Sequence, residues 1–282
     1  MKGLVSYTLN IKGRLLDLSE PQVMGILNVT PDSFFDGSRK QSEEEIRCRV
    51  EQIVNEGGSM IDIGAYSSRP GADDVSAEEE KERLRKGMKI VREIAPDVPV
   101  SVDTFRADVA KMAIEELGAD IINDISGGEL DKNMFKTVAN LKVPYILMHM
   151  KGTPQTMQQA PHYDDLMKDI LLYFAEKVQM LRDLGQKDIV LDPGFGFAKT
   201  LEHNYELMNH LDELKIFELP ILSGISRKSM IYKLLGGTPQ DALNGTSVLN
   251  TISLMKGASI LRVHDVKEAV EVSKIVKAML AR

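Results

Sequence analysis

The chain contains a short apolar run, Gln22-Val23-Met24-Gly25-Ile26-Leu27-Asn28, that ends on a polar side chain. Continuous apolarity over a few residues, without alternation, is typical of a strand that is buried on both faces, as in a parallel sheet. Similar runs recur along the chain at residues 59–63, 98–102, 120–123, 144–148, 188–191, 219–223 and 259–263. We therefore predict eight short parallel strands.

Longer amphipathic stretches separate these runs and predict helices. They cover residues 42–56, Ala77–Ile94, 106–117, 132–141, 164–184, 204–211, 238–255 and 265–280. Ser42 and Glu45 have the spacing of a capping box, which predicts the start of the first helix. Eight strand–helix units in 282 residues favour a (β/α)8 TIM barrel, for which about 250 residues is typical. A doubly wound sheet is the alternative, but the Gly-rich phosphate motif expected after its first strand does not occur.

Nothing in the sequence marks a domain boundary, so we expect one domain over residues 1–282. Residues 5–18 precede the first strand and have the pattern of a β-hairpin. We expect this segment, within an N-terminal cap of residues 1–20, to plug the bottom of the barrel.

The composition excludes several classes of protein. Cys48 is the only cysteine, which rules out an internal disulfide or a Cys-based zinc cluster and indicates a reducing compartment. The net charge of −7 argues against a nucleic-acid or membrane-surface protein. No apolar run approaches the ~20 residues of a membrane-spanning helix, and the N-terminus is too polar for a signal peptide. We expect a cytoplasmic enzyme or small-molecule binder.

Polar side chains follow every predicted strand. In a TIM barrel the carboxyl ends of the strands surround the active site. One polar residue at a strand end is often only a helix cap, and Pro193 after Asp192 fits that interpretation for Asp192. Recurrence at all eight strands favours a site made of Asn28, Ser68, Arg69, Asp103, Asn123, His149, Asp192, Lys228, Arg262 and His264.

These residues fall into two chemical groups. Asp103, Asn123 and Asp192 can read the edge of a heterocycle that presents N–H donors and ring acceptors. Arg69, Lys228, Arg262 and His264 form a cationic group, and the loops after the last two strands are where barrel enzymes most often bind phosphate. The loop after the first strand carries Asp32 beside two phenylalanines, which is typical of a lid that excludes water.

The order of the motifs resembles the dihydropteroate synthase family over nearly the whole chain. The matching segments are Met24 to Phe34, Asp62-Ile63-Gly64 with Ser68-Arg69-Pro70-Gly71, Ser101-Val102-Asp103-Thr104, Ile122-Asn123-Asp124-Ile125, Asp192-Pro193-Gly194-Phe195-Gly196-Phe197, Ser223 to Ser229, and Arg262-Val263-His264-Asp265. The resemblance implies a TIM barrel that condenses a pterin-methyl diphosphate with 4-aminobenzoate for folate synthesis. It also implies a homodimer, for which residues 238–255 and 265–280 are candidate interface helices.

The same resemblance implies a role for each matched residue. The pterin would be held by Asp103, Asn123, Asp192, Lys228 and Met148. The diphosphate would be held by Arg262, His264 and Asn28, with Asn28 also at a Mg²⁺ ion, and Ser68 and Arg69 would lie near it. The aminobenzoate would lie near Phe197 and Ser229. As a hypothesis of our own, Asp32 offsets the cation that develops on the pterin while Arg262 and its neighbours take the leaving group. We therefore expect Asp32, Lys228 and Arg262 to be catalytic.

One departure from the family pattern stands after the second strand. The family commonly reads Gly-Gly-Glu-Ser-Thr-Arg-Pro-Gly, whereas this chain has Gly64-Ala65-Tyr66-Ser67-Ser68-Arg69-Pro70-Gly71, without the acid. Two alternatives remain open from the sequence. A pterin-binding corrinoid methyltransferase would share the acids but would not need the cationic corner, and a non-catalytic paralogue would bind pterin without turnover.

Overall fold

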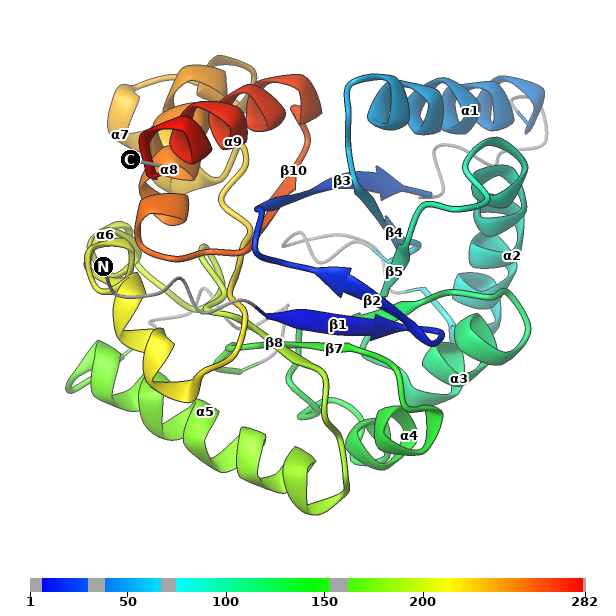
Figure 1. The fold of residues 1–282 in the computed structure, drawn as a ribbon, viewed down its shortest axis with the longest axis horizontal. Helices are drawn as coiled ribbons and strands as arrows, with labels where there is room; N and C mark the ends of the chain where they lie inside the picture. Colours follow the sequence, from blue (N-terminus) through cyan, green and yellow to red (C-terminus); the bar gives the residue numbers. More distant parts are fainter. Residues whose placement is uncertain (1–6, 30–38, 67–74, 153–161, 281–282) are drawn as a thin grey trace.

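Eight parallel strands form a nearly closed barrel in the computed structural model, which describes residues 7–29, 39–66, 75–152 and 162–280. Their order is β8-β7-β6-β5-β4-β3-β10-β9. A parallel bridge between Leu191 and Ile221 joins β8 to the start of β9 and closes the circle. Helices surround the strands on the outside (Figure 1). The predicted (β/α)8 barrel is confirmed.

The strands of the barrel lie close to the predicted runs. They are β3 Gln22–Asn28, β4 Met60–Gly64, β5 Val100–Asp103, β6 Ile121–Asp124, β7 Tyr145–Met148, β8 Ile189–Asp192, β9 Leu222–Ser223 and β10 Ile260–Val263. The helices are α1 Arg39–Asn55, α2 Ala77–Ile94, α3 Ala107–Glu115, α4 Met134–Leu141, α5 Leu166–Asp183, α6 Leu201–Asn209, α7 Ser229–Leu235, α8 Leu243–Met255 and α9 Val266–Leu280, with 3-10 helices η2 Leu211–Phe217 and η3 Pro239–Ala242.

Two helix predictions were wrong in detail. The first helix begins at Arg39 and runs through Ser42, because Arg, Lys and Gln are good helix formers and the helix interior tolerates a serine. The predicted helix over 238–255 is divided into η3 and α8. Thr238 and Asp241 cap η3 reciprocally, so that the first turn is stabilised as a separate unit.

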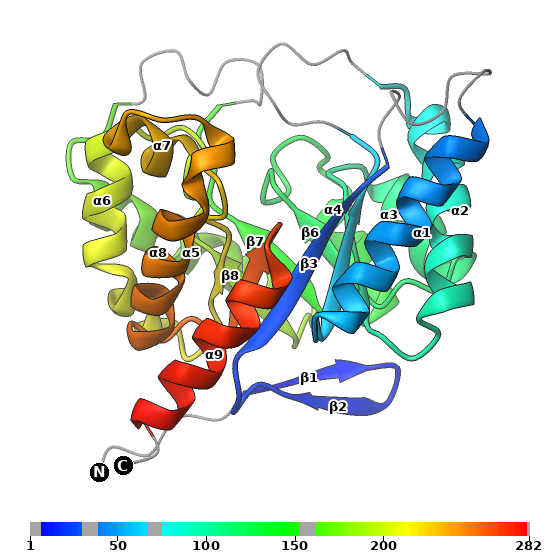
Figure 2. The ribbon, with the colours of Figure 1, turned by 90° about the horizontal axis from the view of Figure 1, so that it is seen from above.

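The predicted N-terminal hairpin forms and plugs the barrel. Strands β1 (Thr8–Ile11) and β2 (Arg14–Asp17) pair antiparallel, and their turn has positive φ at Lys12 and Gly13, as a two-residue hairpin turn requires. Figure 2 shows the hairpin across the end of the barrel where the strands begin. Leu9 and Ile11 pack in one cluster with the first inward side chains of the strands. The tip is fastened by Lys12 Nζ, which lies 2.7 Å from Asp120.

The side chains that fill the barrel are layered. The hairpin packs on an apolar layer that contains Met24, Met60, Ile121, Ile146, Val190, Leu222 and Ile260. Since successive side chains of a strand alternate between its two faces, the next inward residue on each strand is two positions further on. These are Ile26, Asp62, Asn123, Met148, Asp192, Gly224 and Arg262. The strand period thus places a polar layer above an apolar one, toward the carboxyl ends.

Candidate active site

An ion cluster occupies the centre of the polar layer. Arg262 Nε lies 2.6 Å from Asp62 Oδ2, and its Nη2 lies 3.0 Å from Asp103 Oδ2. Asp62 is fully buried, whereas about a fifth of the Asp103 side chain is exposed. Burial acts to lower the pKa of Arg262, but the attraction of Asp62 and Asp103 outweighs it and raises the pKa above its ordinary value. Arg262 is therefore a fixed cation at the mouth of the barrel.

Two buried oxygens of this layer have no hydrogen-bond partner among the described residues. They are Asp62 Oδ1 and Asn123 Oδ1, although the other end of the Asn123 amide donates to Asp62 Oδ2 at 3.2 Å. A buried acceptor without a donor is costly, by about 1–3 kcal/mol. A ligand with several N–H donors would satisfy both acceptors.

The neighbouring carboxylates have shifted acidities. Burial raises the pKa of Asp103 to about 7, because the desolvation outweighs the attraction of Arg262. Burial also raises the pKa of Asp192, against the attraction of Lys228. Asp192 Oδ1 accepts the Gly194 N–H at 2.8 Å, which leaves Oδ2 for a ligand. Asp124 differs, because Ser126, Gly128 and Tyr145 all donate to it; it stabilises a turn.

The turn after β8 is held rigid by side chains that bind its carbonyl groups. The buried Lys199 Nζ donates to Gly194 O and Phe197 O at 3.0 and 3.1 Å, and lies 3.0 Å from His149 Nδ1. Lys228 Nζ donates to Phe195 O and lies 4.6 Å from the centre of the Phe197 ring. The turn therefore fixes Phe197 and Lys228 relative to each other. Sequence analysis missed Lys199; its signal was a lysine directly after an apolar turn.

An apolar patch lies beside these polar groups. Ile125, Met148, Met150 and Ala198 form a small buried cluster, and the rings of Phe105 and Phe197 pack against it. A flat heterocycle is bound well by such a surface on one face and polar groups at its edge. The structure thus brings together five of the predicted pterin residues, namely Met148, Asp103, Asn123, Asp192 and Lys228, and adds Asp62, which the sequence analysis quoted as part of a motif but did not assign to the site.

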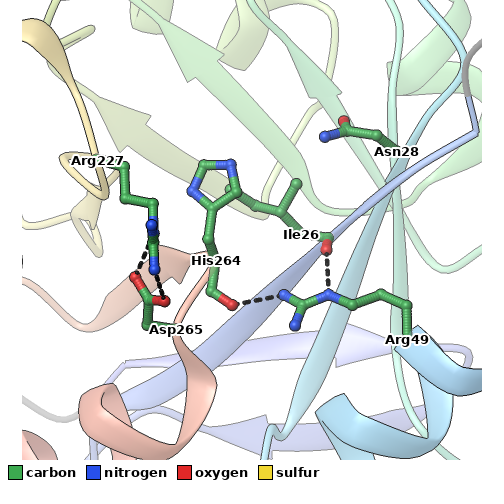
Figure 3. A pocket seen from close by; sticks show the side chains of 6 residues that line it. All are labelled: Ile26, Asn28, Arg49, Arg227, His264 and Asp265. Carbon is green, nitrogen blue, oxygen red and sulfur yellow. Dashed lines mark hydrogen bonds and ion pairs between the residues drawn. The ribbon is translucent and has the colours of Figure 1, made fainter. Parts of the chain in front are cut away.

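A hollow of about 420 Å³ opens where β3 and β10 end. Its lining residues are Ile26, Asn28, Arg49, Arg227, His264 and Asp265 (Figure 3). Arg227 is paired with Asp265 through contacts of 2.6 and 2.9 Å. Arg49 reaches in from α1 and was not foreseen from the sequence.

His264 requires a correction. The sequence analysis counted it among the cations, but burial, helped by the charge of Arg262, lowers its pKa to about 4. Its Nδ1 lies 3.2 Å from Ser226 Oγ, and its backbone N–H donates to the same oxygen at 3.1 Å. His264 is therefore neutral near neutral pH and acts as a hydrogen-bonding group. The positive charge of this hollow comes from arginine.

Asp32, Ser68 and Arg69 fall outside the described residues. Ser229 is the first residue of α7, directly after Lys228, and so lies at the same edge of the site. Tyr66, in the place of the family's acid, meets the Phe105 ring edge-on at 5.0 Å, and the Arg106 guanidinium lies 4.8 Å from the Phe105 ring. Arg106 is paired with the buried Glu80. An aromatic pair and a neighbouring ion pair are therefore found where the family commonly has an acidic residue.

Comparisons with known proteins agree with this geometry. The family model described as "Pterin binding enzyme" matches residues 24–264. The dihydropteroate synthase of Escherichia coli is 44% identical over 274 residues, which cover 96% of this chain and 95% of that protein. A Yersinia pestis dihydropteroate synthase structure with a sulfonamide drug complex has a TM-score of 0.87 at 44% identity, covering 98% and 100% of the two chains. A Xanthomonas albilineans dihydropteroate synthase with 4-aminobenzoic acid has a TM-score of 0.89 at 36% identity, covering 98% and 99%.

The fold and the site therefore define a pterin-binding barrel enzyme, and the family match agrees. Within that class, the chain belongs to the dihydropteroate synthase family. The family predicted from the sequence is confirmed, and with it the assignment as a transferase of folate biosynthesis. None of the helices in the described part of the chain is long and apolar enough to cross a membrane.

Proposed function

We propose that this chain condenses 6-hydroxymethyl-7,8-dihydropterin diphosphate with 4-aminobenzoate at the mouth of the barrel, giving 7,8-dihydropteroate and diphosphate. The observation that carries this proposal is the pair of unpartnered buried acceptors, Asp62 Oδ1 and Asn123 Oδ1, beside a flat apolar patch. A pterin has N–H donors along one edge and two aromatic faces. Asp103, Asn123 and Asp192 read that edge, and Met148 packs on a face.

The reaction breaks one bond and forms another at the pterin methylene carbon. The amine nitrogen of aminobenzoate attacks this carbon, the C–O bond to the diphosphate breaks with its electron pair on oxygen, and the amine loses a proton to water. The pterin ring spreads the positive charge that develops. Arg262, a fixed cation, and Lys228, in its protonated form, stabilise the departing anion, and no covalent enzyme intermediate is required.

The leaving diphosphate is assigned to the hollow lined by Asn28 and His264. A Mg²⁺ ion fits there only together with phosphate oxygens. Asn28 supplies one neutral oxygen, and the described residues contain no group of three or more acidic, His or Cys side chains that could hold a metal. Mg²⁺ is commonly bound through one or two carboxylates plus substrate phosphates, so with a neutral amide the phosphates would have to supply the negative charge. When bound, it would neutralise charge on the leaving group, and Asn28 would hold it.

The remaining roles complete the proposal. Phe197 and Ser229 bind the aminobenzoate, and the stacked Lys228 holds the Phe197 ring in place. Ser68 and Arg69 bind the diphosphate from the loop after β4. Asp32 offsets the developing cation from the loop after β3; Asp32→Asn is expected to slow turnover, and turnover at the wild-type rate would show that the carboxylate has no such role.

A two-substrate assay for diphosphate release tests the function. The purified protein is expected to release one diphosphate per dihydropteroate formed, and only when both substrates are present. A corrinoid methyltransferase would release none, and a non-catalytic paralogue would bind the pterin without release. Either result would refute the proposed reaction.

The affinity for the pterin diphosphate should depend on pH in a defined way. Asp103, with a pKa of about 7, accepts N–H donors at both oxygens only when ionised, because protonation turns one of them into a donor, so affinity should fall as the pH drops below about 7. Lys228, with a pKa lowered to about 8 by burial, is charged only below that value, so affinity should fall again above it. Fluorescence titration should give a maximum between these values. Asp103→Asn should remove the acid limb, and an unchanged acid limb would contradict the assignment.

We also propose a homodimer through α8 and α9. Large apolar side chains are exposed on these helices, among them Val248, Met255, Ile275 and Met279, each more than half exposed. Several exposed apolar side chains on two neighbouring helices fit a subunit interface. Sedimentation equilibrium should give a dimer that Ile275→Glu converts to a monomer; a wild-type monomer would contradict this. We place the enzyme in the cytoplasm, because the exposed Cys48 has no disulfide partner and suits a reducing compartment.

A further inference from the structure

Arg49 joins two strands at the point where their ladder stops. The last register pair between β10 and β3 is Val263 with Gly25. The residues that follow this pair are His264, directly after β10, and Ile26 on β3. The Arg49 guanidinium bridges their carbonyl groups. Its Nε donates to Ile26 O at 3.1 Å, and its Nη2 donates to His264 O at 2.6 Å (Figure 3). The guanidinium thus continues the connection between the strands beyond their own hydrogen bonds.

The bridge sets the spacing of two side chains of the diphosphate site. Asn28 lies two residues beyond Ile26, on the same face of β3, and His264 is itself one end of the bridge. Ser226 restrains the other side of His264. Arginine donates to the two carbonyl groups from separate nitrogens of one rigid plane, whereas a lysine would have to reach both from a single nitrogen. The position of Asn28 relative to His264 therefore depends on Arg49.

Arg49 also supplies charge. Burial lowers its pKa from the ordinary value, but a guanidinium stays protonated near neutral pH. Arg227, across the hollow, is neutralised by Asp265. Within the described ranges no carboxylate lies within ion-pair distance of Arg49. Glu56 and Asp265 attract Arg49 from a greater distance. Because His264 is neutral and Asp265 already balances Arg227, Arg49 leaves the described lining of this hollow with a net positive charge.

We propose that Arg49 is a positioning residue for the leaving diphosphate: it fixes the spacing between Asn28 and His264 and gives their hollow its net positive charge. The proposal rests on the proposed function, which assigns the diphosphate to this hollow. If so, diphosphate binding depends on a residue of α1 as well as on residues at the strand ends.

A matched pair of variants tests it. Arg49→Met removes the bridge and the charge, while Arg47→Met removes the same charge from the same helix at a solvent-facing pair with Glu93. Calorimetry with inorganic diphosphate and Mg²⁺ should show affinity reduced about tenfold or more in Arg49→Met and unchanged in Arg47→Met. The KM for the pterin diphosphate should rise in Arg49→Met, while the KM for aminobenzoate stays constant.

Arg49→Lys separates geometry from charge, and it keeps the test valid if Arg49→Met fails to fold. It should recover only part of the diphosphate affinity, because an ammonium cannot bridge both carbonyl groups in the same way. Wild-type diphosphate affinity in Arg49→Met, or in Arg49→Lys, would overturn the proposal while the two-substrate assay still supports the proposed function. A wild-type protein that binds no diphosphate and releases none would overturn both.

Discussion

Arg262→Met is expected to reduce kcat/KM for the pterin diphosphate by about 1000-fold and to destabilise the fold by about 3 kcal/mol. The guanidinium is the direct partner of both Asp62 and Asp103, and Asp62 is fully buried. Its removal leaves a carboxylate in the barrel without a cation, and it removes a fixed positive charge from the leaving group. Steady-state kinetics and urea unfolding measure the two effects separately.

A second substitution distinguishes these effects. Asp62→Asn in the Arg262→Met background removes the orphaned charge, so it should restore a large part of the lost unfolding free energy. It should restore none of the activity, because the cation is still missing. Recovery of activity in the double variant, or full activity in the single one, would show that Arg262 serves only to compensate Asp62.

Lys228→Met is expected to lower kcat/KM for the pterin diphosphate by about 100-fold. Lys228 provides the strongest attraction that lowers the pKa of the buried Asp192. Without it the pKa of Asp192 should rise further, which weakens Asp192 as an ionised acceptor for the pterin. The variant also leaves Phe195 O without its donor and releases the Phe197 ring, so the KM for aminobenzoate should rise as well.

Lys233→Met is the control for this variant. Lys233 lies on the same helix, α7, and is exposed, so the same change of charge there should leave kinetics unchanged. The alkaline limb of the pterin affinity, near pH 8, should be present in Lys233→Met and absent in Lys228→Met. If the limb persists in Lys228→Met, another group titrates there and the role given to Lys228 is wrong.

The barrel could be predicted because its determinants are local. Runs such as Gln22–Asn28 show the strands, and the period of two along each strand then dictates which side chains point inward. The bounds of α2 agree with the prediction because Ser76 caps its first turn and Glu78, Glu79 and Glu80 suit its N-terminus. The apolar run at residues 219–223 indicates β9 but not that it is only two residues long, and the 3-10 helix η2 has no comparable signal.

The site was predicted only in part, because its remaining members act through distant partners. Asp62 is a lone acid in a buried strand, and that irregularity is a signal that was available. Lys199 and Arg49 could not be assigned, since their roles depend on backbone carbonyl groups from other segments. The neutral state of His264 follows from burial and from Arg262, which only the fold brings close.

The net charge of −7 describes the whole surface and not the site. Both proposed substrates are anions, so the attraction must come from local cations. Arg262, Lys228 and Arg49 are such groups among the described residues, and all three are held in place by contacts to acids or carbonyl groups.

A crystal structure of this protein with bound pterin tests the central claim most directly. The account predicts that the ring lies on the Met148 face, with its N–H groups about 2.7–3.2 Å from Asn123 and from the free oxygen of Asp192. Arg262 and Lys228 should lie on either side of the methyl substituent. A pterin bound elsewhere, with the oxygens of Asp62 and Asn123 still unpartnered, would contradict the account.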